Sequence, residues 1–264
     1  MITLTTDFGL VEPYVGAMKG VIYTINPQAR IEEITNSVQS FDVLDGALAI
    51  AQAYSYFPQN TVHVVVVDPG VGGTRRPIVA SVGQYSFVAP DNGVLSLVYE
   101  REERITVRHI TSEYYFHQPI SNTFHGRDIF APIAAYLSKG VDSSKFGEEI
   151  TDYVRFVAPK PKATAPNTWK CLVLKTDKFG NLMTNITPKD VPQLFSANNG
   201  FKINVGKAEV TKLRTNYAEA PPGEIFAILG SAGFLEISTN KGAASQLAGA
   251  NKGSEVTLTV AGGA

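Results

Sequence analysis

A carboxylate, a guanidinium and an imidazole that could together activate a water molecule lie in two loops of the N-terminal half of the chain. Asp68 directly follows residues 62–67, a mostly β-branched run that predicts a buried strand. Arg75 and Arg76 come after a glycine-rich stretch, and an arginine that folds back would keep Asp68 ionised and fix its geometry. The alternative is a turn carboxylate followed by a surface arginine pair. His125 precedes a predicted helix, where an imidazole could exchange a proton or hydrogen-bond a small nucleophile, although a single histidine is more often structural.

Asp7 is a different kind of candidate, because it follows the first predicted strand, residues 2–5. Ligands of open parallel sheets bind beyond the carboxyl ends of the strands. A carboxylate there can accept both hydroxyls of a ribose diol, and it can equally form an Asx-turn or cap a helix. A metal site, typical of a metal-dependent nucleotide phosphohydrolase, is a further alternative, although the chain lacks the tight His/Asp spacing of that class. Its ligands would be Asp7, Asp68, Asp91, His125 and Asp128.

The elements that position these residues alternate between strands and helices. Asp42 is the expected N-cap of a helix over residues 42–57, which Pro58 ends. Two further helices are predicted, one from Tyr14 to Ile25, which Asn26 and Pro27 end, and one over residues 128–138. Strands separated by helices predict an α/β domain with a mainly parallel sheet covered by helices.

The pattern changes after residue 157 to a proline-rich stretch and then to short apolar runs separated by Gly, Asn, Asp and Pro. These runs predict a small all-β barrel or sandwich, with no helix longer than residues 189–197. We therefore predict an α/β domain over residues 1–157, a linker over 158–168 and a β-barrel domain over 169–264.

Composition argues against nucleic-acid-binding, disulfide-bonded, secreted and membrane-spanning proteins. The 264 residues carry 23 Lys plus Arg and 24 Asp plus Glu, a net charge of −1, so binding to nucleic acid through phosphate neutralisation is not expected. The single cysteine cannot close an intrachain disulfide, which suits a reducing cytoplasm. The N-terminus does not resemble a secretory signal, and no apolar window approaches the length of a spanning helix. We expect a cytoplasmic protein that binds neither nucleic acid nor membranes.

Six short motifs, in this order and spacing, resemble those of the S-adenosyl-L-methionine (SAM) hydroxide adenosyltransferase family, whose members hydrolyse SAM to adenosine and are related to fluorinating and chlorinating enzymes. The motifs cover essentially the whole chain. They are residues 5–9 (TTDFG), 14–20 (YVGAMKG), 66–72 (VVDPGVG), 89–93 (APDNG), 123–128 (TFHGRD) and 177–181 (DKFGN).

The resemblance implies a role for each matching residue. Asp68, Arg75 and His125 would be the set that positions and activates water, and Asp7 would hold the ribose diol. The other substrate contacts it implies are Asp177 for the methionine amino group, Ser231 for methionine, Phe179 and Asn181 for adenine, and Phe41 in the pocket. Tyr14, Phe41 or Phe179 would offer an aromatic face to the sulfonium. It also implies a homotrimer whose SAM sites lie between the first domain of one subunit and the barrel domain of the next.

Three departures from the halide-using relatives bear on the nucleophile and on methionine. Those relatives carry tyrosine in place of Asp68 and serine in place of Gly126, and a carboxylate beside the reacting carbon should repel a halide. Ala232 stands where the fluorinating enzymes carry an arginine that binds the methionine carboxylate. We therefore expect hydrolysis of SAM by in-line attack of water on ribose C5′, without a metal or cofactor, and with either Asp68 or His125 taking the proton. A non-catalytic SAM- or adenosine-binding protein is the alternative outside enzymology.

Overall fold

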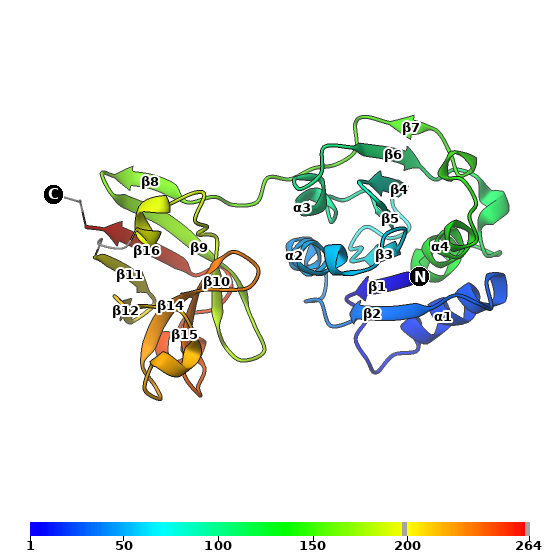
Figure 1. Ribbon diagram of the computed structural model, residues 1–264. Coiled ribbons are helices and arrows are strands. Elements are labelled where there is room, and N and C mark those ends of the chain that lie inside the picture. The colour runs from blue at the N-terminus through cyan, green and yellow to red at the C-terminus, as the bar shows by residue number, and fades with distance from the viewer. Residues whose placement is uncertain (197–199, 262–264) are drawn as a thin grey trace. The chain divides into compact units, whose positions relative to one another are not determined.

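The computed structural model describes residues 1–196 and 200–261, so Ala197 at the end of the predicted 189–197 helix lies outside the described residues. The chain divides into two compact units, Met1–Ala158 and Pro159–Ala264 (Figure 1). Within the stretch assigned from sequence to a linker, β8 (Lys162–Ala165) pairs with β9 (Thr168–Thr176) of the second unit.

The first unit is built on a seven-stranded mixed sheet. Its strands, in spatial order, are β2 (Ile31–Thr35), β1 (Ile2–Thr6), β3 (Val62–Val66), β5 (Tyr85–Pro90), β4 (Pro77–Val82), β6 (Ile105–His109) and β7 (Glu149–Ile150). The pairs from β2 to β5 are parallel, and those from β5 through β4 and β6 to β7 are antiparallel.

The expectation of a mainly parallel sheet is therefore not confirmed, and a tight turn explains why. β4 and β5 are joined by the two-residue turn Gly83–Gln84, in which Gly83 has φ +58°. Such a turn returns the chain antiparallel to itself, whereas a parallel neighbour needs a long crossover.

Helices cover both faces of this sheet (Figure 1). α1 (Tyr14–Ile25) and α4 (Ala131–Ser138) pack together on one face, and α2 (Val43–Ala53) and α3 (Ser96–Tyr99) lie on the other. Asp42 caps α2 by accepting a hydrogen bond from the Asp45 amide, as predicted. A single π-helical turn, Gly126–Phe130, leads into α4. Short 3₁₀ turns lie at Tyr54–Tyr56, Glu113–Tyr115 and Ser143–Lys145.

The second unit is a nine-stranded sheet curled into a half-barrel, so the prediction of a small all-β barrel is confirmed in part. β8 pairs with β9, and the remaining strands follow the order β12 (Ala208–Val210), β11 (Phe201–Val205), β16 (Glu255–Val260), β9, β10 (Leu182–Thr184), β15 (Leu235–Thr239), β14 (Ile225–Leu229) and β13 (Leu213–Arg214). One α-helix, α5 (Ala244–Ala248), and 3₁₀ turns at Pro192–Phe195 and Tyr217–Glu219 complete the described part. Alternate residues of β16 are buried, which gives the sheet a dry inner face.

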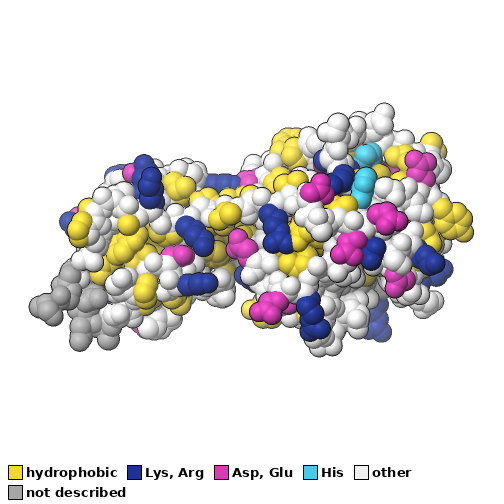
Figure 2. Space-filling model, turned by 90° about the horizontal axis from the view of Figure 1, so that it is seen from above, with side chains coloured by type: hydrophobic (Ala, Val, Ile, Leu, Met, Phe, Trp, Pro, Cys, Tyr) yellow, Lys and Arg dark blue, Asp and Glu magenta, His cyan; other side chains and the backbone are white. Residues whose placement is uncertain are grey.

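The surface carries both signs of charge. On the face of the described residues drawn in Figure 2, acidic and basic side chains are interspersed over both units. None of the described helices is long and apolar enough to cross a membrane.

Candidate active site

Asp68 and Arg75 form a nearly buried ion pair in the first unit. The Arg75 Nε donates to both Asp68 carboxylate oxygens at 3.1 and 3.0 Å, and its Nη2 donates to Oδ2 at 2.6 Å. The side chains are 5% and 10% exposed, so water screens the pair little. The guanidinium also lies 5.4 Å from the ring centroid of Phe130, at the start of α4. These contacts hold the carboxylate in one orientation, as the sequence predicts for an arginine that folds back.

The loop between Asp68 and Arg75 packs against the loop that carries His125. Gly72 has φ +74°, and a β-carbon on it would lie 2.1 Å from the carbonyl oxygen of Asn122. Only glycine permits both the backbone conformation and the close approach. The glycine-rich stretch therefore brings together two loops that are about fifty residues apart in the sequence.

His125 completes the cluster through Arg75. The Arg75 Nη2 donates to His125 Nδ1 at 2.6 Å, and because a guanidinium can only donate, Nδ1 is unprotonated here. A neutral imidazole then carries its proton on Nε2. Burial and the charge of Arg75 hold the pKa of His125 below its ordinary value, although the charges of Asp68 and Asp128 oppose this. The structure thus places Asp68, Arg75 and His125 in one hydrogen-bonded cluster.

A cavity of about 510 Å3 adjoins this cluster. It is lined by Asp68 and His125 from the cluster and by Asp7, Tyr14 and Phe41, the residues of this unit that the resemblance implies in substrate binding. Its other lining residues are Phe8, Ser40, Val66, Val71, Ser121, Thr123, Phe124, Gly126 and Arg127.

Asp7 hydrogen-bonds a distant loop instead of forming the Asx-turn or helix cap that its position in the sequence also allows. Its Oδ2 accepts a hydrogen bond from the Phe41 amide at 2.8 Å, while Oδ1 receives none from the described residues. Phe41 has φ +64°, a conformation that a non-glycine residue seldom adopts, and its side chain is largely exposed at the cavity. The carboxylate therefore holds a strained backbone with one oxygen and leaves the other for a ligand.

Aromatic side chains form one wall of the cavity. The rings of Phe8, Tyr14 and Phe124 contact one another at centroid distances of 5.2 to 5.8 Å. A β-carbon on Gly126 would lie 3.2 to 3.3 Å from side-chain atoms of Phe124, Met18 and Phe8. A larger residue at Gly126 would therefore press on this wall.

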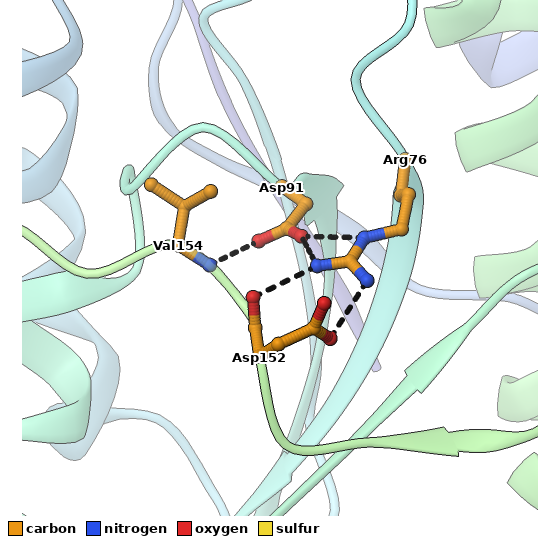
Figure 3. Close-up of polar contacts among 4 residues, drawn as sticks. All are labelled: Arg76, Asp91, Asp152 and Val154. Carbon is orange, nitrogen blue, oxygen red and sulfur yellow. Dashed lines mark hydrogen bonds and ion pairs between the residues drawn. The ribbon is translucent and has the colours of Figure 1, made fainter.

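Arg76 belongs to a separate network, although it is adjacent to Arg75 (Figure 3). Its Nε and Nη2 donate to Asp91 Oδ2 at 2.9 and 2.7 Å. Its Nη1 donates to Asp152 Oδ1 at 2.8 Å, and its Nη2 also donates to the Asp152 carbonyl oxygen at 3.0 Å. The other Asp91 oxygen accepts from the Val154 amide at 2.8 Å. Arg75 therefore pairs with Asp68, and Arg76 ties the 89–93 loop to the end of the first unit.

The proposed metal ligands do not fit a cation site. Asp68 is paired with Arg75, Asp91 with Arg76, and the fully buried Asp128 with Arg127 and the Ser121 amide. A guanidinium thus already neutralises each of these carboxylates. The described residues contain no group of three His, Cys, Asp or Glu side chains suited to a metal ion.

The second unit has its own cavity, of about 780 Å3. It is lined by all four residues that the resemblance assigns to this part of the chain, Asp177, Phe179, Asn181 and Ser231. The Asp177 Oδ1 accepts from the amides of Phe179 and Asn181, both at 2.8 Å, and its Oδ2 accepts from Asn181 Nδ2 at 2.9 Å.

Sequence reasoning missed three ionisable residues that line this cavity: Tyr217, Glu236 and Lys241. Glu236 interrupts an apolar run that predicts a strand, and this was the available signal. Lys241 has φ +54°, which the sequence did not indicate.

Comparison with known proteins assigns the family. Residues 2–147 match the N-terminal domain of the SAM hydroxide adenosyltransferases, and residues 171–257 match their C-terminal domain. The chain belongs to the SAM hydroxide adenosyltransferase family. The resemblance seen in the six sequence motifs is thereby confirmed.

Relatives that align with nearly the whole chain support this assignment. The (R)-S-adenosyl-L-methionine hydrolase of Methanocaldococcus jannaschii is 36% identical over 94% of this chain and 91% of its own, and that of Thermus thermophilus is 34% identical over 96% and 97%. Fluorinases are more distant, at 24% to 26% identity. A crystal structure of an uncharacterized conserved protein from Thermotoga maritima is 37% identical and superimposes with a TM-score of 0.90, covering 98% of this chain and 100% of that one.

Proposed function

We propose that this adenosyltransferase family member hydrolyses SAM to adenosine and L-methionine, and that, like the relatives named for it, it acts on the (R)-sulfonium form. The observation that carries the proposal is the braced cluster of Asp68, Arg75 and His125 on the wall of a cavity that also contains Asp7. The names of the full-length relatives support the same reaction.

The reaction is an in-line displacement. The oxygen of one water molecule forms a bond to ribose C5′ while the C5′–S bond breaks, and the bonding electron pair stays on sulfur. Methionine leaves as a neutral thioether, one water proton remains on the new 5′-hydroxyl, and the other is released. In the proposed reaction the protein aligns the water molecule with C5′ and excludes bulk solvent, and no metal or organic cofactor takes part.

The hydrogen-bond directions favour Asp68 as the group that accepts the water proton. His125 Nδ1 already accepts from Arg75, and its Nε2 carries a proton, so the imidazole can donate to the water oxygen. The Asp68 carboxylate can accept from the water while Arg75 holds it in place. The proton then passes to solvent. Arg75 orients both neighbours without contacting the carbon.

Substrate binding is assigned to both cavities. In the first, Asp7 Oδ1 accepts the ribose hydroxyls, and Tyr14 and Phe41 present aromatic faces to the sulfonium. In the second, the substrate contacts are Asp177, Phe179, Asn181 and Ser231. We propose a cytoplasmic homotrimer in which the first cavity of one subunit and the second cavity of the next hold one SAM molecule.

Chromatography of SAM incubated with the purified protein tests the function. Separate incubations with the (R) and (S) sulfonium forms, each with and without a chelator, should yield equal amounts of adenosine and methionine from the (R) form in both conditions. Unchanged SAM together with tight binding by calorimetry would instead identify a binding protein. A product that appears only with added divalent metal would contradict the proposed mechanism.

A further inference from the structure

Glu236 places an unneutralised carboxylate in the cavity of the second unit. It lies on β15, next to β10 and β14, and is half-buried. A β-carbon on Gly230 would lie 2.1 Å from its Oε1, so the glycine backbone packs directly on the carboxylate. Among the described residues its one hydrogen-bond donor is the Tyr217 hydroxyl, at 3.5 Å from Oε2. Lys241 lines the same cavity, but among the described residues it forms no ion pair with Glu236.

The two carboxylates of this cavity differ in how their oxygens are used. Asp177 accepts three hydrogen bonds from its own loop, whereas Glu236 has most of its acceptor capacity free. Burial, and then the negative charge of Asp177, raise the pKa of Glu236. A cation bound beside Glu236 would relieve both effects, because it would supply donors to the free oxygens and offset the repulsion between the carboxylates.

We propose that Glu236 binds the α-ammonium group of the methionine part of the substrate. The assignment rests on the proposed function, since SAM carries such a group and Phe179 and Asn181 of the same cavity are assigned to its adenine. A primary ammonium has three donors and no acceptor, which matches a carboxylate that is short of donors. Asp177, to which the resemblance assigns the same amino group, contributes its charge to the site, but its oxygens chiefly order the 177–181 loop, so Glu236 is the further residue that supplies free acceptors. Glu236 is thus a specificity-determining residue for amino-acid-bearing sulfonium substrates.

The test combines a variant with an altered substrate. Rates and binding are measured for wild type, Glu236→Gln and Glu255→Gln, each with SAM and with an analogue in which hydrogen replaces the α-amino group. Glu255 is the matched control, because it is an exposed glutamate of the same unit that pairs with Lys170 away from the cavity.

For Glu236→Gln we expect KM and the calorimetric Kd for SAM to rise by about 10- to 100-fold with little change in kcat, as befits loss of a charge-assisted hydrogen bond. The same variant should bind the deaminated analogue as wild type does, and Glu255→Gln should match wild type with both compounds. Glu236→Asp, which keeps the charge, should recover part of the affinity and guards against a folding defect.

Equal losses for SAM and the analogue, or no loss for either, would overturn the assignment. Failure of the proposed function has a different signature, because a wild type that forms no adenosine can still be compared with its variants by calorimetry. Selective loss of SAM binding in Glu236→Gln would then support ammonium recognition on its own.

Discussion

The Nη2 of Arg75 donates a hydrogen bond to Nδ1 of His125 at 2.6 Å, which fixes the neutral tautomer of the imidazole. The same nitrogen donates to Asp68, so one guanidinium orients both groups that we assign to the reacting water. A protonated imidazole would place two donors against each other. The neutral state of His125 is therefore a property of the cluster and can be tested apart from catalysis.

Titration of His125 by NMR should give a pKa below the ordinary value of 6.5, because burial and the Arg75 charge both disfavour the imidazolium. In Arg75→Met the pKa should rise, since one of these causes is removed and Asp68 then attracts the proton. A His125 pKa above 6.5 in the wild type, or one that falls when Arg75 is removed, would contradict this arrangement.

A second histidine should make the fold sensitive to acid. His63 is fully buried among aromatic rings, accepts or donates one hydrogen bond with the Thr3 hydroxyl at 2.7 Å, and stacks on Phe87. Burial lowers the pKa of His63 to about 3. Between pH 6.5 and that value the unfolded chain binds a proton that the folded chain does not, so the stability that is present above pH 6.5 is lost as the pH falls, by up to about 1.4 kcal/mol per pH unit.

Urea unfolding of wild type and His63→Phe between pH 4.5 and 7.5 measures this contribution. The variant keeps the aromatic packing, and its free energy of unfolding should fall less steeply below pH 6.5 than that of the wild type. The difference in slope should correspond to nearly one fewer proton taken up on unfolding. Parallel curves for the two proteins would show that His63 does not supply the acid sensitivity.

Arg76 pairs with one buried and one exposed carboxylate, so the two pairs allow the effect of burial on stability to be compared directly. Arg76→Met would leave the Asp91 carboxylate, which is 2% exposed, without its guanidinium, and should lower the free energy of unfolding by about 2 to 4 kcal/mol. Asp152→Asn removes the other partner, which is 77% exposed, and should leave the free energy of unfolding nearly unchanged, because solvent screens an exposed ion pair. Similar losses in both variants would show that burial does not determine how much each ion pair contributes to the free energy of unfolding.

Sequence reasoning succeeded where a local signal fixes the structure. Asp42 has the residue type and position of an N-cap, and the structure shows its capping hydrogen bond. That an arginine folds back onto Asp68 was also predictable, because a flexible glycine-rich loop separates Asp68 from Arg75 and Arg76, but the choice of Arg75 came from the family resemblance. The placement of His125 beside them depended on the family resemblance, since about fifty residues separate it from Arg75.

What the sequence did not reveal depends on pairing between distant segments. The direction of β4 and β5 is decided by the turn at Gly83, and without that turn the strands read as two more members of a parallel sheet. Glu236 and Tyr217 come together only through the curl of the second sheet, nineteen residues apart. Alternation of apolar and polar residues indicates which face a side chain occupies, but not which side chain lies opposite.

The central claim is that the Asp68 carboxylate directs a water molecule at ribose C5′. Its most direct test is the rate of adenosine formation from (R)-SAM by Asp68→Asn, a variant of nearly the same size, alongside calorimetric binding of SAM and the exposed control Asp152→Asn. We predict a loss in rate of at least about 100-fold with SAM binding retained, and an unchanged rate in the control. Adenosine formation by Asp68→Asn at the wild-type rate would contradict the account.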